Sequence, residues 1–310
     1  MNYQKISYKE KIRTLHEVPE YRTSAALCHA LGISRGSLLN WKEDDSRISE
    51  TNRVKIDTLY CKAVLLPTMG DDMPDHPPVA LPGDFFDEPQ LRQRIVHRMS
   101  FGSLEIETGT NEEDYKSVIE DDTIPHDLHK QEVLEINGIT ATTNRMVAEV
   151  GAEGALYIID SRRIKDWHAS VMQGIRTDAG QYSKKIRILP DTDIQTTTPE
   201  DIEAEVEYWV TRYKNTKTLE EISIAHAHFE SIHPFGDGNG RVGRLIMAAQ
   251  CLRAGLMPPE INKRHKALYY AVLEHAQITG KAGPLVQFLN GRCNATLTEY
   301  RPTIIPHADY

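Results

Sequence analysis

The sequence predicts a mainly α-helical protein, with a small N-terminal helical domain and a larger helical domain. Apolar residues recur at helical spacing near the N-terminus and again over residues 219–252. A proline-rich stretch separates these two regions. At roughly 100–200 residues per domain, 310 residues accommodate two or three domains.

The composition, 40% hydrophobic and 26% charged, is that of an ordinary globular protein. It excludes a wholly disordered chain, a collagen-like repeat and a disulfide-stapled miniprotein. No apolar run approaches the roughly 20 residues of a membrane span, and the first residues lack the apolar core of a signal peptide. We therefore expect a cytoplasmic protein with no membrane partner, whose four cysteines are buried, reduced thiols.

Residues 1–65 are slightly basic, whereas the whole chain has a net charge of −9. Within this segment, Gly32 suits a left-handed turn between two short helices, and Ser34 can cap the second helix. The expected shared core consists of Leu27, Leu31, Ile33, Leu38 and Trp41. The pattern resembles a DNA-binding helix-turn-helix, for which the candidate DNA contacts are Arg35, Ser37, Asn40 and Lys42. The alternative is a helical hairpin that packs on another part of the protein, because three acidic residues follow the second helix.

Residues 66–90 contain six of the sixteen prolines. Because proline fixes φ and removes a backbone donor, this stretch predicts a linker or a wrapping arm rather than a helix or an inner strand. The predicted boundaries are therefore 1–65 for the N-terminal domain and 91–310 for the second domain.

Residues 219–256 predict two consecutive helices. The first should run over 219–232, with an apolar stripe, and should end at His233 because Pro234 disfavours helical geometry there. Three glycines within residues 236–240 indicate a tight loop. The second helix should start at Arg241 and end near residue 255.

A glycine-rich loop that opens a helix is suited to bind an anion. Arg241 and Arg244 lie on the first turn of the second helix, where each cation costs about 0.3–1 kcal/mol against the helix dipole. A polyphosphate would compensate this charge. Asp237 offers a hard oxygen ligand to Mg²⁺, and His233 is a candidate general base. The alternative, a structural turn with surface arginines, leaves the charge arrangement unexplained.

The segment from His233 to Arg244 resembles the Fic family signature HPFxDGNGRxxR at every specified position. The resemblance implies a Fic-type helical bundle with a small β-hairpin flap, and transfer of AMP from Mg-ATP to a Ser, Thr or Tyr hydroxyl of a target protein. His233 would deprotonate that hydroxyl, and Asp237 would hold Mg²⁺. The implied ATP and phosphate ligands are Gly236, Gly238, Asn239, Gly240, Arg241 and Arg244.

The resemblance also implies a flap over residues 180–190 that pairs with an extended target segment. Its expected target contacts are Ser183, Lys184, Lys185 and Ile186. Similar sequences often carry Arg where this chain has Ser183. Three residues are candidates for the adenine pocket: Tyr269, Tyr270 and Asn290.

Residues 103–108 resemble the family's inhibitory motif, a Ser or Thr followed four residues later by Glu and then Gly or Asn. Here Ser103 and Glu107 match, and Thr108 departs from the pattern. Glu107, on a helix near 100–110, would pair with Arg244 and occupy the space of the γ-phosphate. Whether this helix acts within one chain or across a homodimer is left open. Two alternative functions also stay open: a DNA-binding regulator whose Fic fold senses nucleotide, and a hydrolase that removes AMP with the help of Glu107.

Overall fold

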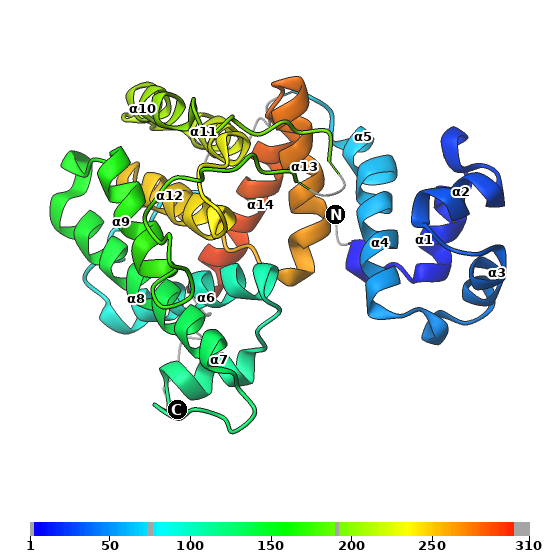
Figure 1. The fold of residues 1–310 in the computed structure, drawn as a ribbon, viewed down its shortest axis with the longest axis horizontal. Helices are drawn as coiled ribbons and strands as arrows, with labels where there is room; N and C mark the ends of the chain where they lie inside the picture. Colours follow the sequence, from blue (N-terminus) through cyan, green and yellow to red (C-terminus); the bar gives the residue numbers. More distant parts are fainter. Residues whose placement is uncertain (1–2, 73–76, 78, 190–191, 301–310) are drawn as a thin grey trace, which may run out of the picture.

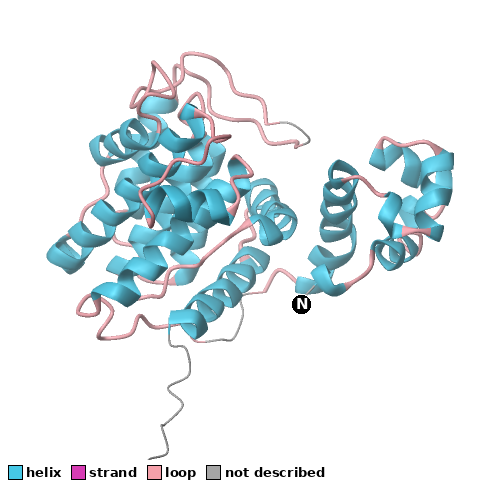
Figure 2. Cartoon of the chain, turned by 90° about the horizontal axis from the view of Figure 1, so that it is seen from below, coloured by secondary structure: helices cyan, strands magenta, loops and turns pink. Residues whose placement is uncertain are grey.

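The computed structural model describes residues 3–72, 77, 79–189 and 192–300. The chain forms a large helical body and a smaller helical part beside it, joined through α4, α5 and α13 (Figure 1). Over the described ranges, β structure amounts to two isolated antiparallel bridges, Ala80–Leu256 and Ile188–Gln195. Figure 2 accordingly shows helices joined by loops. The mainly α-helical fold class is therefore confirmed. None of the helices in the described ranges is long and apolar enough to cross a membrane.

The smaller part contains the predicted pair of short helices. Gly32 adopts the left-handed conformation, with φ 64°, and the backbone N–H of Ser37 donates to Ser34 Oγ at 3.0 Å. The predicted core side chains are buried, apart from Ile33, which is half-buried at its edge. The helices here are α1 (Tyr8–Leu15), α2 (Ser24–Leu31), α3 (Arg35–Glu43) and α4 (Glu50–Tyr60). Short 3₁₀ turns cover Tyr3–Lys5, Pro19–Tyr21 and Asp45–Arg47.

The helix α4 continues beyond residue 65, into the stretch expected to be a linker. A π-helical turn, η4 (Cys61–Leu65), leads into the single helical turn α5 (Leu66–Met69). Pro67 is tolerated because it lies in the first turn of α5, where a missing N–H is least costly.

Further along the proline-rich stretch, the chain wraps onto the large body. Leu81 N donates to Gly255 O and Met257 N donates to Val79 O, both at 2.8 Å, and the Phe85 side chain is fully buried. This segment therefore has the form of an arm rather than a free linker.

The large body is built around α12, which is buried on nearly all sides and packs against α6, α8, α9 and α11. A helix that is buried all round belongs to the centre of a core, so its N-terminus lies deep in the body. The helices are α6 (Pro89–Glu107), α7 (Glu112–Ile119), α8 (Lys130–Glu153), α9 (Ser161–Val171), α10 (Ile202–Tyr213), α11 (Leu219–Ile232), α12 (Asn239–Arg253), α13 (Lys266–Thr279) and α14 (Gly283–Tyr300). Two 3₁₀ turns cover Gly154–Leu156 and Lys263–His265.

One helix, α13, is shared between the two parts. Its small residues Ala267 and Ala271 belong to the hydrophobic core of the smaller part, while Tyr269 and Val272 belong to the core of the large body. Alanines one helical turn apart allow α4 and η4 to approach closely. The smaller part is thus seated on a helix that also lines the candidate site.

Candidate active site

The loop between α11 and α12 begins as predicted. Helix α11 ends at His233, which adopts the left-handed conformation with φ 52° and ψ 56°. Asn239 closes the loop: its Oδ1 accepts from Phe235 N at 2.8 Å, and its Nδ2 donates to Phe235 O at 2.9 Å. Helix α12 starts at Asn239, two residues before the predicted start. Both polar atoms of the Asn239 side chain are therefore bonded within the loop, so a ligand would contact the backbone N–H of Asn239 rather than its side chain.

His168 on α9 contacts this loop through its ring and through a hydrogen bond. Its ring stacks on the buried Phe235 ring, with centroids 3.8 Å apart. Its Nδ1 accepts from Gly180 N at 2.8 Å, so Nε2 carries the proton and donates to Asp237 O at 3.0 Å. Burial lowers the pKa of His168 to about 4, and the ring is neutral at pH 7. Sequence reasoning missed His168, because a single histidine on a helix belongs to no motif.

The start of α12 gathers positive charge. Arg241 is 3% exposed and lies 3.6 Å from Glu135 and 3.5 Å from Asp237. Within the described chain, Nε and Nη1 of Arg241 and Nη1 of Arg244 are buried donors without a hydrogen-bond partner. Buried donors are normally satisfied, so unsatisfied guanidinium N–H donors beside a helix N-terminus indicate a site for an anion.

Arg244 is held by the last turns of α6. Its Nη2 lies 2.7 Å from Glu107 Oε1, and its Nε donates to Ser103 Oγ at 2.9 Å. A methyl group built on Gly240 would come within 2.5 Å of the same Glu107 oxygen, so this carboxylate lies over the first turn of α12. Burial opposes ionisation of Glu107, but the charge and hydrogen bond of Arg244, with help from Arg241, bring its pKa below the ordinary value. Glu107 is therefore an anion placed at the anion site.

Two titratable groups flank the arginines. Burial lowers the pKa of His233, although the carbonyl of Glu230 partly opposes this, so the ring is neutral at pH 7 and able to accept a proton. Burial raises the pKa of the Glu230 carboxyl to about 7. This carboxyl lies against Gly243, where a side chain would collide with it. In the sequence, Glu230 stands out only as a charged residue on the last turn of a largely apolar helix.

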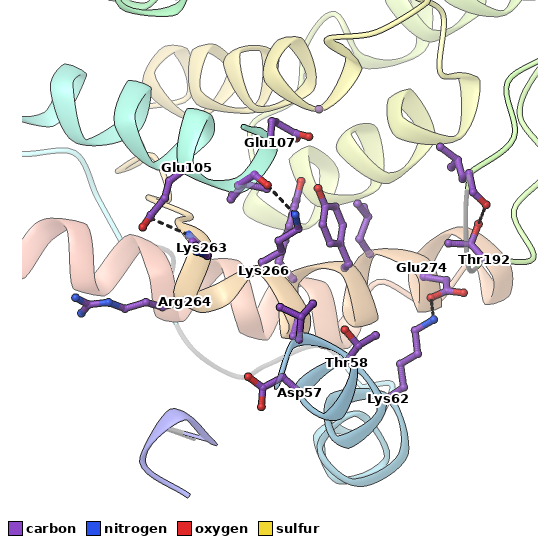
Figure 3. Close-up of a pocket in the computed structure, with 18 of the residues that line it drawn as sticks. Asp57, Thr58, Lys62, Glu105, Glu107, Thr192, Lys263, Arg264, Lys266 and Glu274 are labelled. Carbon is purple, nitrogen blue, oxygen red and sulfur yellow. Dashed lines mark hydrogen bonds and ion pairs between the residues drawn. The ribbon is translucent and has the colours of Figure 1, made fainter. Parts of the chain in front are cut away.

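A cavity of about 900 Å³ opens onto this site (Figure 3). Its lining includes His233, Gly240 and Arg244, whereas Asp237 is exposed and is not part of the lining. The same cavity is lined by Tyr269 and Tyr270, two of the candidates for the adenine pocket. The third candidate, Asn290, is instead buried on α14 and is not part of the lining.

The predicted flap passes beside the loop. Ser183 N donates to Pro234 O at 2.8 Å, and Arg187 donates to the Gly236 carbonyl, a contact that sequence reasoning missed. Over its described residues the flap has the single bridge Ile188–Gln195 rather than two paired strands; position 190 lies outside them.

The four expected target contacts on the flap differ in exposure. Lys184, Lys185 and Ile186 are exposed, the last at 68%. Ser183 is instead buried, and its hydroxyl donates to Lys185 O at 2.8 Å. Of the four expected contacts, the three that follow Ser183 are therefore the exposed ones.

The fold and the site define a mainly helical protein in which a glycine-rich loop and buried arginine donors meet at the N-terminus of a central helix. Residues 158–251 match the family model described as Fic/DOC family. This part of the chain is a Fic/DOC family domain, and the resemblance to the Fic family is confirmed.

Curated relatives match over a limited region. The chain is 41% identical over 78 residues to Protein adenylyltransferase Fic of Aedes aegypti, which is 25% of this chain and 15% of that protein. It is 35% identical over 97 residues to the protein of the same name from Drosophila virilis, covering 30% and 20%. The chain thus spans at most a fifth of the length of these relatives.

Solved structures resemble the fold of this chain over a larger share of its length. A Fic domain containing signaling protein from Bacteroides thetaiotaomicron matches 71% of this chain and 90% of its own, with a TM-score of 0.63 and 18% identity. Fic-1 (residues 134–508) from C. elegans matches 95% of this chain and 97% of its own, with a TM-score of 0.58 and 19% identity. At these identities the likeness shows the fold alone.

Proposed function

We propose that this protein transfers AMP from Mg-ATP to a Ser, Thr or Tyr hydroxyl of a target protein. The observation that carries the proposal is the set of buried, unused guanidinium donors of Arg241 and Arg244 beside the glycine-rich N-terminus of α12. The matched relatives named as protein adenylyltransferases support the same reaction.

The reaction assigns a role to each group in the loop. Backbone N–H groups at Asn239 and Gly240, with both arginines, would bind the phosphates and the charge that develops on the leaving pyrophosphate. The target hydroxyl would attack the α-phosphorus, giving its proton to His233. The bond from the α-phosphorus to the bridging oxygen would break, and pyrophosphate would leave. A neutral His233 matches this role.

The donor set also fits a magnesium ion carried with ATP. Oδ1 of Asp237 accepts from Gly238 N at 2.6 Å, and the carboxylate is 55% exposed. Among the described residues, no group of three or more His, Cys, Asp or Glu could hold a metal. One carboxylate with phosphate and water oxygens is a common arrangement for Mg²⁺, which would supply charge neutralisation to the phosphates.

We further propose that Glu107 inhibits the reaction. Its carboxylate occupies the space over Gly240 and neutralises Arg244, the arginine expected to bind the γ-phosphate. This contact lies within a single chain, so it supports inhibition without a second copy. Glu107 would have to withdraw before ATP binds in the productive position.

The test uses ATP labelled at the α-phosphate. Glu107→Gly should label itself or a lysate protein more strongly than wild type, and Glu107→Gly/His233→Ala should lose the label. Absence of label with Glu107→Gly would refute transfer of AMP. If Glu107→Gly instead loses a hydrolytic activity that wild type has on an AMP-modified protein, the de-AMPylase alternative replaces the proposal.

A second candidate function is DNA binding by residues 1–65. The favouring observation is the left-handed turn at Gly32 followed by the Ser34 cap, which leaves Arg35 and Asn40 exposed on α3. Duplex binding should weaken with salt and on Arg35→Ala or Lys42→Ala. If neither substitution changes the affinity for duplex DNA, α3 is not the helix that contacts DNA.

A further inference from the structure

The cavity continues beyond the phosphate end along one face of α13. Lys266, Tyr270, Glu274 and Gln277 succeed one another at helical spacing and all line it. Lys266 Nζ donates to Ile106 O at 2.7 Å, next to Glu107. Since a helix rises 1.5 Å per residue, Glu274 lies about 12 Å farther along the axis. The Glu274 end is therefore remote from the phosphate-binding turn.

Three separate segments build this remote end. Helix α13 contributes Leu273 and Glu274, the flap and the residues after it contribute Leu189 and Thr192, and the smaller N-terminal part contributes Thr58 and Lys62. Figure 3 shows Lys62 reaching from its helix to Glu274, on the side of the pocket away from Glu105. Apolar side chains from α13 and the flap beside polar groups are suited to a flat heterocycle with a polar edge.

The polar group at this end is the Glu274 carboxylate, one oxygen of which is paired with the Lys62 ammonium. Lys62 Nζ lies 2.5 Å from Glu274 Oε2, and the two side chains are 34% and 15% exposed. A carboxylate that is half-occupied by an ammonium keeps one oxygen as an acceptor. The ammonium comes from the N-terminal part, so the end of the cavity is incomplete without that part.

We propose that Lys62 sets the nucleobase preference of the site by occupying one oxygen of Glu274. The inference rests on the proposed function, because it takes the ligand to be a nucleoside triphosphate. Guanine presents two adjacent N–H donors on one edge, which fit both oxygens of a free carboxylate. Adenine presents one amino donor beside a ring acceptor. With Oε2 held by Lys62, guanine loses one of two hydrogen bonds and adenine loses none, so adenine is favoured.

The experiment measures the dissociation constants of Mg-ATP and Mg-GTP by calorimetry, in the Glu107→Gly background. Lys62→Met should lower the preference for ATP over GTP by about tenfold, the worth of one hydrogen bond to a charged group. In Lys62→Met/Glu274→Gln the gain in GTP binding should disappear, because the pair of carboxylate acceptors is gone. An unchanged preference in Lys62→Met, or a GTP gain that survives Glu274→Gln, would overturn the inference.

A matched control exists in the same region. Lys281 Nζ lies 2.6 Å from Asp71 Oδ2, an ion pair that also links the stretch after α5 to the region of α13 but lies outside the cavity. Lys281→Met should leave the ATP to GTP preference unchanged. An equal change in this variant would trace the effect to general loosening and overturn the assignment to Lys62. If Glu107→Gly binds neither nucleotide, the proposed function itself fails, and the base preference fails with it.

Discussion

Replacing His168 with Phe tests how the loop between α11 and α12 is held. The Phe ring can keep the stack on Phe235, but it removes the hydrogen bonds to Asp237 O and Gly180 N. The His168 side chain is fully buried, so a Phe ring in its place leaves both backbone groups without this partner. Each stranded backbone group costs about 1–3 kcal/mol. We therefore expect the free energy of unfolding to fall by about 2–6 kcal/mol.

The assay is urea unfolding followed by circular dichroism, with the exposed His29 on α2 as the control position. His29→Phe should change the free energy of unfolding by less than about 0.5 kcal/mol. His168→Gln places an amide donor near the position of Nε2 and should recover part of the loss. A His168→Phe variant that loses less than about 1 kcal/mol would refute the role of His168 as the fastening of the loop.

Three further predictions follow from contacts elsewhere. Lys266→Met removes the hydrogen bond to Ile106 O at the end of α6 and should raise the proposed AMP transfer, measured with labelled ATP; unchanged transfer would mean that α6 is held without this bond. Asp57→Ala leaves the buried Lys11 ammonium unpaired and should cost about 3–5 kcal/mol in urea unfolding, whereas a loss under about 1 kcal/mol would contradict this. Burial lowers the pKa of His265 to about 3, so the unfolded chain takes up this proton at higher pH. The free energy of unfolding should therefore be retained above about pH 6.5 and fall as the pH drops toward 3, and His265→Gln should flatten that fall.

Local chemistry explains why the helix ends were predictable. Pro234 ended α11, Gly32 ended α2 and Ser34 capped α3, each through backbone geometry within a few residues. The same reasoning failed at Leu66–Met69, where tertiary packing of η4 on α13 extended the helix through Pro67. The flap also differed, since its described residues form one bridge instead of a strand pair.

The sequence by itself determined the loop from His233 to Arg244, because glycine, proline and asparagine impose its turns locally. Tertiary structure alone decided which distant groups meet there: Glu107 reaches Arg244 across 137 positions, and Lys62 reaches Glu274 from another part of the protein. Backbone preferences act over a few residues, whereas such pairs depend on how whole helices pack. Packing places the N-terminus of α12 beside α6 and α8, whose Glu107 and Glu135 lie next to Arg244 and Arg241.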